Sequence, residues 1–140
     1  MAETKCSIII VCKGRLEHLK RTLPFAIAQQ ASEVIVVDYD CPDGTSAWAA
    51  ENYPDVRVVK VDSAPLFHQA NARNVGAASA SGNWLFFMDA DILMAERLLP
   101  DLASVLTTGC FYRPSPLARQ TWGTVLVSRE DFAGWVDTMR

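Results

Sequence analysis

Short apolar runs rich in β-branched residues alternate with segments of helical periodicity along most of this chain of 140 residues. The runs cover residues 7–11, 34–37, 57–61 and 84–88, and each has the length of a buried strand. The segments between them have the length of one helix. Strands that alternate with helices form right-handed βαβ units around a parallel sheet. We therefore expect an α/β fold, a three-layer sandwich with a mainly parallel central sheet.

Helical spacing of apolar residues predicts the helices that connect these strands. Pro24 should kink or restart the first helix, because proline removes a helical hydrogen bond. Thr45 is the expected N-cap of the second, short helix. Beyond Gly109 the pattern weakens, and we expect edge strands, which can run antiparallel, and a terminal helix. The expected helices cover residues 16–27, 47–51, 69–79, 96–106 and 129–139, and the expected edge strands cover 110–113 and 124–128.

Composition and charge are those of an ordinary soluble globular domain, and we expect one domain spanning residues 1–140. Half of the residues are hydrophobic and 21% are charged. The net charge of −3 argues against a nucleic acid or an anionic membrane surface as a partner. No apolar stretch approaches the ~20 residues of a membrane span, and no signal peptide is visible. Four cysteines without a Cys-x-x-Cys spacing favour a reduced, cytoplasmic setting.

Pairs of acidic residues follow the second and the fourth apolar runs. Asp38 and Asp40 follow the second run, and Asp89 and Asp91 follow the fourth. Open α/β folds bind their ligands at the carboxyl ends of the strands, and residues i and i+2 of an extended segment point the same way. Two converging carboxylates suit Mg²⁺ or Mn²⁺, whose other ligands are water and a diphosphate. The fourth strand therefore predicts a site for a metal and a diphosphate.

Each acidic pair also has a structural interpretation that the sequence leaves open. Asp89 and Asp91 can simply end the strand and cap the helix that follows. Asp38 and Asp40 can form an Asx-type turn that leads into residues 42–44. In a nucleotide site, a carboxylate after the second strand would instead accept a hydrogen bond from a ribose hydroxyl or a base N–H.

A nucleotide in this crevice also needs cations near its phosphates, and Arg73, Arg15 and Lys13 can supply them. Other chemistries lack their signatures. His18 and His68 are far apart and do not suggest a two-histidine metal site. The sequence contains no Gly-x-Ser-x-Gly elbow, no Gly-x-Gly-x-x-Gly after the first strand and no P-loop, which argues against hydrolase triads, nicotinamide enzymes and P-loop enzymes.

Four motifs occur in order between residues 6 and 92. They are the stretch CKGRLEHL at 12–19, the acidic turn VVDYD followed by DGT within 36–45, the helical segment ARNVG at 72–76 and the strand with its acids, WLFFMDADI, at 84–92. In this order and spacing they resemble the nucleotide-sugar glycosyltransferases of the GT-A fold. The similarity is to family 2 and, more widely, to the β-1,4-galactosyltransferase pattern.

This resemblance implies a metal-dependent glycosyltransferase that binds a UDP-sugar, with Mn²⁺ or Mg²⁺ as cofactor. Asp38 would receive the uracil N3–H, so uracil is expected rather than guanine. Asp91 would ligate the metal directly, whereas Asp89 would act through ribose or water; both are taken as metal residues. The nucleotide-binding residues that the resemblance implies are Cys12, Lys13, Gly14, Arg15, Asp38, Asp40, Arg73, Asp89, Ala90 and Asp91.

The resemblance weakens after residue 92. Residues 123–132 resemble the strand and loop that precede the acceptor region, where the family has a Gly-rich segment and a Glu-Asp pair whose Asp is the base in inverting members. This chain offers Asp137 as a candidate base, at a different spacing and without the Gly-rich loop. An abbreviated acceptor region should expose apolar side chains and favour self-association, most simply a two-fold dimer. The candidate side chains are Trp122, Phe132 and Trp135.

Two functions from different classes remain open at this point. The first is a glycosyltransferase that uses a UDP-sugar and an unknown acceptor. The second is a module that binds UDP or a nucleotide sugar with little or no transferase activity. A nucleotidyltransferase on a related sheet is a third interpretation, but it favours a Gly-rich, Lys-bearing loop after the first strand, to which residues 13–15 correspond poorly.

Overall fold

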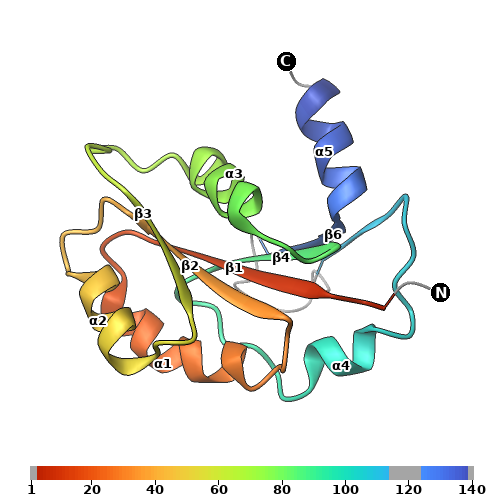
Figure 1. Ribbon diagram of the computed structural model, residues 1–140, viewed down its shortest axis with the longest axis horizontal. Coiled ribbons are helices and arrows are strands. Elements are labelled where there is room, and N and C mark those ends of the chain that lie inside the picture. The colour runs from red at the N-terminus through yellow and green to blue at the C-terminus, as the bar shows by residue number, and fades with distance from the viewer. Residues whose placement is uncertain (1–2, 114–123, 139–140) are drawn as a thin grey trace.

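A computed structural model describes residues 3–113 and 124–138, without the side chains of residues 135–138. The described chain forms a central sheet with helices on both faces (Figure 1). One face carries α3 (Gln69–Ser79) and α5 (Arg129–Thr138), and the other carries α1 (Leu16–Ile27), α2 (Thr45–Asn52) and α4 (Leu98–Leu102). The expected three-layer α/β architecture is confirmed.

The six strands of the described residues lie in the order β3-β2-β1-β4-β6-β5. Strands β1 to β4 are parallel, whereas β6 runs antiparallel to both β4 and β5. The crevice at the carboxyl ends of β1 and β4 is a topological switch point, because the chain winds outward in opposite directions from it. The strands are β1 (Cys6–Cys12), β2 (Glu33–Tyr39), β3 (Arg57–Val61), β4 (Trp84–Asp89), β5 (Phe111–Tyr112) and β6 (Val125–Ser128).

Strand β1 is buried along its whole length and contributes to two hydrophobic cores. Ile8 and Ile10 belong to the core that packs against α1, and Ile9 and Val11 belong to the core that packs against α3. Side chains alternate between the faces of a strand, so one apolar run supplies both layers. Each fully buried aliphatic side chain contributes about 1.5–3 kcal/mol to folding. The central position of β1 in the sheet therefore follows from its continuous apolar sequence.

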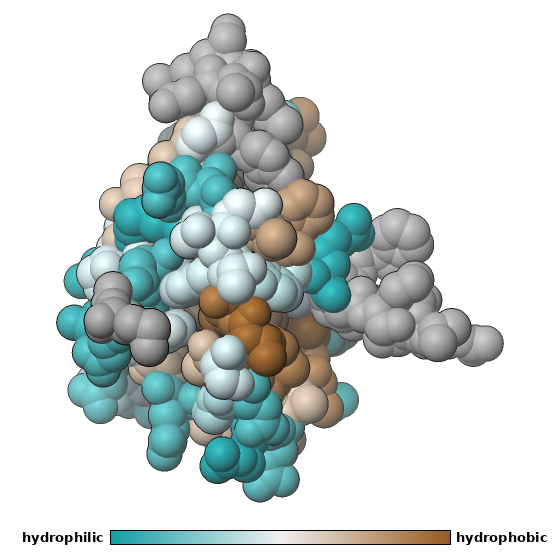
Figure 2. Space-filling view, turned by 90° about the vertical axis from the view of Figure 1, so that its right-hand side faces the viewer, coloured by the Kyte–Doolittle hydropathy of each residue, from teal (hydrophilic) through white to brown (hydrophobic). Residues whose placement is uncertain are grey.

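Figure 2 shows the side of the molecule on which β1 begins, at the right of Figure 1. On this face polar side chains gather at the left and the bottom, and apolar side chains occupy the centre and several separate places around it. None of the helices in the described part of the chain is long and apolar enough to cross a bilayer.

The structure bears on two local expectations about the first helices. Pro24 lies inside α1, which is continuous from Leu16 to Ile27, so the helix does not restart there. Thr45 is the first residue of α2 and not its N-cap, so that prediction is wrong by one position. Gly44 is the N-cap, with a φ of 77° that favours glycine. The Thr45 hydroxyl is buried and donates to the Cys41 thiol at 3.1 Å.

Helix α4 is shorter than the sequence predicts. Arg97 has a φ of 58°, outside the helical region, so the helix begins only at Leu98. After Leu102 the backbone is held by a tyrosine on β5: the Tyr112 hydroxyl accepts from the Thr107 N–H at 2.9 Å and donates to the Val105 carbonyl at 3.2 Å. These contacts, made by a side chain five to seven residues further along the chain, replace the helical hydrogen bonds that the periodicity suggested.

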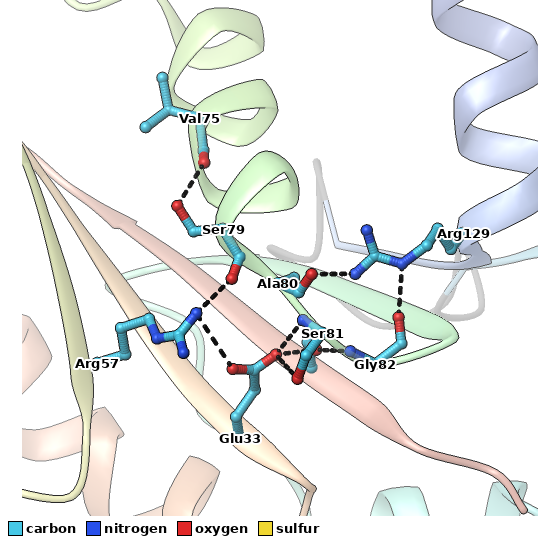
Figure 3. A network of polar contacts seen from close by, with 9 residues as sticks. Glu33, Arg57, Val75, Ser79, Ala80, Ser81, Gly82 and Arg129 are labelled. Atoms are coloured by element: carbon cyan, nitrogen blue, oxygen red, sulfur yellow. Dashed lines mark hydrogen bonds and ion pairs between the residues drawn. The ribbon is translucent and has the colours of Figure 1, made fainter.

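A polar network fixes the turn between α3 and β4 at the amino end of the sheet (Figure 3). Glu33, the first residue of β2, accepts hydrogen bonds from the Ser7 hydroxyl at 2.6 Å and from the Ser81 N–H and hydroxyl at 2.5 and 2.9 Å. The Arg57 guanidinium lies 3.9 Å from the other carboxylate oxygen. The network ties α3 to β1, β2 and β3 on the side opposite to the crevice.

Two arginines hold the backbone of the same turn (Figure 3). Arg57 donates to the Ser79 carbonyl, and Arg129 donates to the carbonyls of Ala80 and Gly82. Because Arg129 is the first residue of α5, the turn also joins α3 to the terminal helix. Carbonyl groups that would otherwise end a helix without partners are satisfied in this way.

Glu33→Gln should destabilise the protein by about 1–3 kcal/mol at pH 7, since hydrogen bonds to a charged group are lost. Burial alone would raise the pKa of Glu33, but the hydrogen bonds from Ser7 and Ser81 and the charge of Arg57 outweigh it and lower the pKa from 4.5. This stabilisation is present above the unfolded pKa and is lost as the pH falls through the lower folded value. Urea unfolding between pH 7 and 3 should show the difference between wild type and variant shrinking below about 4.5.

Glu51→Gln, on the exposed surface of α2, is the control for this measurement and should match the wild type. A Glu33→Gln deficit that stays constant over the whole pH range would show that the charge of Glu33 is not what stabilises the turn.

Candidate functional site

A pocket of about 450 Å³ lies at the carboxyl ends of β1 and β4, at the switch point of the sheet. The end of β1 with its loop, the segment leading into α3 and the end of β4 contribute to it. The pocket brings together six of the residues that the sequence assigns to the nucleotide, namely Lys13, Gly14, Arg15, Asp89, Ala90 and Asp91. Its other lining residues are Val11, Phe67 and Gln69.

Asp89 ends β4, and α3 orients its carboxylate. One carboxylate oxygen accepts a hydrogen bond from the Gln69 amide at 2.8 Å and lies 3.4 Å from the Arg73 guanidinium. Arg73 also lies 6.0 Å from the centroid of the Phe87 ring, in cation–π range. Gln69 was not among the residues predicted for the site. It lies one helical turn before Arg73 and therefore on the same face of the helix, and this spacing could have indicated it.

The backbone after Asp89 is held by two buried polar side chains, one in α1 and one in the turn that follows it. The Thr22 hydroxyl donates to the Ala90 carbonyl at 2.6 Å. Gln29, which follows the end of α1, donates to the Ala95 carbonyl at 2.7 Å and accepts from the Leu99 N–H at 3.0 Å. These contacts fix the segment that carries the acids, although it has no regular secondary structure of its own.

Thr22→Val should destabilise the protein by about 1–3 kcal/mol, because it leaves the Ala90 carbonyl buried without a partner. It should also weaken Mn²⁺-dependent nucleotide binding, since Ala90 lies between Asp89 and Asp91. Thr22→Ser keeps the hydroxyl and should restore both properties. Urea unfolding and calorimetric titration check the two effects; a Thr22→Val variant with wild-type nucleotide affinity would remove the positioning role.

Lys13 lines the pocket, but its ammonium group joins three loops. Its Nζ donates to the carbonyls of Tyr39, Asp40 and Ala64 at 3.3, 2.9 and 2.8 Å. An ammonium group has three N–H donors, and here each has a carbonyl acceptor. Lys13 therefore fixes the wall of the pocket, and contact with a phosphate would require it to exchange one of these partners.

Asp38 and Asp40 do not line the pocket. Asp38 is 2% exposed and accepts hydrogen bonds from the N–H of Cys41 at 2.9 Å, the N–H of Ser46 at 3.0 Å and the Ser46 hydroxyl. Asp40, with a φ of 48°, accepts from the Ala64 N–H at 2.9 Å. These hydrogen bonds are the ones expected if Asp38 and Asp40 form an Asx-type turn. The nucleotide-binding role of both residues stays a prediction.

The loop after β1 depends on a glycine and on two thiols. Gly14 has a φ of 65°, which favours glycine, and its N–H donates to the Cys41 thiol at 3.2 Å. Cys12 is fully buried, and burial raises its pKa to about 12, so the thiol is neutral and packs beside the Thr45 hydroxyl at 3.6 Å. Arg15, in contrast, is exposed at the pocket, where its charge can meet a diphosphate.

The donor set of the pocket fits a divalent cation that is shared with a ligand. In residues 3–113 and 124–134, no group of three or more His, Cys, Asp or Glu side chains could hold a metal by itself. Asp89 and Asp91 offer two carboxylates, and Asp91 is exposed. Mg²⁺ is held in many sites by one or two carboxylates together with phosphates and water. The metal assignment stays a prediction, but its chemistry suits these residues.

Asp137 lies in α5, and its side chain is outside the described part. Helix α5 starts directly after Ser128, which pairs with Trp84 at the beginning of β4, so the helix begins at the opposite end of the sheet from the acids. Figure 1 shows α5 rising from the sheet there. Asp131 at its start accepts from the Ser128 hydroxyl at 2.5 Å and the Gly109 N–H at 2.8 Å. The catalytic role of Asp137 stays a prediction.

Of the three aromatic residues expected to be exposed, only the side chain of Phe132 is described. It is half-buried, and its ring packs on that of Phe87 with 5.1 Å between centroids. Trp122 and the side chain of Trp135 lie outside the described part. Phe132 therefore contributes to the core beside α3, and the expected dimer stays a prediction.

Comparison with solved structures finds the same fold in glycosyltransferases. A mannosyltransferase from Pyrobaculum calidifontis in complex with GDP-Man and Mn²⁺ matches 96% of the chain and 47% of its own length, with a TM-score of 0.76 and 18% identity. TarS from S. aureus in complex with UDP matches 93% of the chain and 48% of its own length, with a TM-score of 0.66 and 17% identity. The chain thus spans about half the length of these two structures.

A nucleotidyl transferase from Methanothermobacter thermautotroptrophicus also shares the fold, with a TM-score of 0.75, 13% identity, and coverage of 95% of the chain and 76% of its own. None of the curated proteins matches the chain in sequence. Residues 7–112 match the family described as "Glycosyl transferase family 2". This match agrees with the glycosyltransferase neighbours and not with the nucleotidyl transferase. The match covers the pocket and the strands β1 to β5 except for the first residue of β1. The chain therefore belongs to glycosyl transferase family 2.

Proposed function

We propose that this chain is the donor-binding part of a metal-dependent glycosyltransferase whose donor is a nucleotide sugar, with a UDP-sugar as the first candidate. One observation carries the proposal: Asp89 and Asp91 line the same pocket as the glycine loop after β1, at the switch point of the sheet. The bound ligands of two structural neighbours, GDP-Man with Mn²⁺ and UDP, are consistent with it.

In this proposal Asp91 and Asp89 hold Mn²⁺ or Mg²⁺, which neutralises charge on the departing diphosphate. Gln69 and Arg73 fix the Asp89 carboxylate, so the ligand geometry is set before the donor arrives. Arg15 adds positive charge at the opening of the pocket. Gly14 lets the backbone approach the ligand closely, since it has no side chain in the way.

A nucleotide-sugar binding module is the second candidate, and one observation favours it. The carboxylates among the described lining residues are Asp89 and Asp91, and both are assigned to the metal. A base must reach hydrogen-bond distance of the acceptor hydroxyl, and the described residues of the pocket offer no further carboxylate for that task. The two candidates share the binding site and differ in the chemical step.

Calorimetric titration with UDP, GDP and CDP, each with and without Mn²⁺, tests the site. We expect UDP to bind only with the metal. The preference for uracil rests on the family resemblance, and GDP binding at least tenfold more tightly than UDP would remove it. Slow Mn²⁺-dependent hydrolysis of a UDP-sugar would support the transferase, whereas binding without hydrolysis would favour the module. UDP binding that is unchanged in excess EDTA would contradict both forms of the metal site.

A further inference from the structure

Phe67 contributes an exposed aromatic surface to the pocket. Its side chain is 45% exposed and lies with Gly14, Arg15 and the acids among the lining residues. Phe25 and Phe111 are as exposed, at 46% and 49%, but neither lines this pocket. The exposure of Phe67 therefore coincides with a binding site, whereas the other two rings have ordinary surface positions.

The Phe67 ring is held in place from the protein side. Tyr39, the last residue of β2, packs against it edge to face, with 5.7 Å between centroids and an angle of 80° between the ring planes. Tyr39 is 2% exposed, and its hydroxyl accepts from the Asn71 amide at 2.9 Å. A ring fixed in this way loses little conformational freedom when a ligand binds.

The segment that carries Phe67 is tied to the site at both ends. At one end Ala64 donates its N–H to the Asp40 carboxylate, and its carbonyl accepts from Lys13. At the other end Gln69 donates to Asp89. The position of the ring relative to the acids is therefore set by contacts with β1, β2 and β4.

Phe67 lies on the β2 side of the pocket, whereas the acids lie on its β4 side. The acids follow β4, the glycine loop follows β1, and Tyr39, against which Phe67 packs, ends β2. These strands are neighbours in the order β2-β1-β4, and two strand spacings amount to roughly 10 Å. In a nucleoside diphosphate the ribose separates the base from the diphosphate. A nucleoside diphosphate with its diphosphate at Asp89 and Asp91 can therefore extend its base toward β2, on the side where Phe67 lies.

The carboxylate that the family resemblance assigns to the base is already occupied. Asp38 is buried and accepts three hydrogen bonds from Cys41 and Ser46 within its own turn. An exposed, immobilised aromatic ring is the other kind of group that recognises a base, through stacking of π faces. This is what the same edge of the sheet offers at Phe67.

We propose that Phe67 is the stacking platform for the base of the nucleoside diphosphate. This inference rests on the proposed function and refines it. Stacking accepts every base, because every base has a π face. The ring accordingly contributes to affinity and leaves the choice of base to other groups.

Calorimetric titration in the presence of Mn²⁺ with UDP and with pyrophosphate, which has no base, separates the two parts of the ligand. Phe67→Leu keeps an apolar side chain but removes the ring, and it should weaken UDP binding by about 5- to 100-fold. Its affinity for pyrophosphate should be unchanged. Phe67→Tyr should retain the affinity for UDP. Phe25→Leu, at an equally exposed ring on α1, is the matched control and should bind both probes like the wild type.

Unchanged UDP affinity in Phe67→Leu, while the wild type binds UDP and pyrophosphate, would overturn the stacking role alone. Equal losses for both probes would also overturn it, since the diphosphate part of the site would then be disturbed. A loss for UDP-glucose without a loss for UDP would place the sugar on the ring instead of the base. A wild type that binds neither UDP nor pyrophosphate with Mn²⁺ would contradict the proposed function itself, and this subsite with it.

Discussion

Asp91→Ala should abolish Mn²⁺-dependent UDP binding, and Asp89→Ala should weaken it by about 10- to 100-fold. Asp91 is exposed at the pocket, where its carboxylate can ligate a cation directly. One carboxylate oxygen of Asp89 already contacts Gln69 and Arg73, so Asp89 is better suited to act on the metal indirectly, through ribose or water. Loss of a direct ligand leaves the metal and the diphosphate poorly compensated. Calorimetric titration with UDP at saturating Mn²⁺ measures both variants.

Asp55→Ala is the control for this pair, because Asp55 is an exposed acid in the turn between α2 and β3. It should bind UDP like the wild type. Wild-type affinity in Asp91→Ala would exclude the metal site and with it most of the argument for transferase chemistry. A larger loss in Asp89→Ala than in Asp91→Ala would reverse the assigned order of the two acids.

Gly82→Ala should destabilise the protein by about 3 kcal/mol, because the added methyl group overpacks a rigid site. A Cβ at Gly82 would lie 2.6 Å from the Lys5 carbonyl oxygen, 2.6 Å from the Ser7 hydroxyl and 2.8 Å from the Ser7 nitrogen. Two of these atoms belong to the backbone at the start of β1 and cannot rotate away. The loss is a large part of the total stability of a typical domain, about 5–15 kcal/mol. Urea unfolding at pH 7 measures it.

Gly134→Ala provides the matched control within the same chain. Gly134 lies in α5, and a Cβ there would meet no atom within 4 Å. Alanine is the better helix former, so this variant should gain about 0.5–1 kcal/mol. If both variants lose stability equally, the close approach at Gly82 is not the cause.

The strands and most of the helices could be predicted from the sequence because their signals are local. Continuous apolar runs gave β1, β2 and β4 within two residues of their bounds, and the parallel arrangement followed from the alternation with helices. Helix α4 was the main error: the Tyr112 hydroxyl, from β5, holds the backbone at Val105 and Thr107 in a way that no local pattern reveals.

The candidate site could be predicted in part, for the same reason. Residues that directly follow β1 and β4 had to meet, since both strands are parallel and adjacent, and the pocket does contain Gly14, Arg15, Asp89 and Asp91. The groups that orient them were missed. Thr22 and Gln69 come from α1 and α3, and their ordinary polar side chains carry no motif.

The sequence by itself determined which segments are strands, which acids end them and to which family the chain is similar, because periodicity and motif order are properties of the chain alone. The tertiary structure decided which of those polar groups remain available to a ligand. Asp38 and Lys13 stand in motifs, yet their hydrogen bonds are taken up by Ser46, Cys41 and three carbonyl groups from other loops. Phe67 stands in no motif, yet it remains exposed at the pocket. Which groups are buried or hydrogen-bonded depends on how the segments pack. The acceptors of Lys13, for example, lie 26 to 51 residues away in the chain, so only the folded structure fixes them.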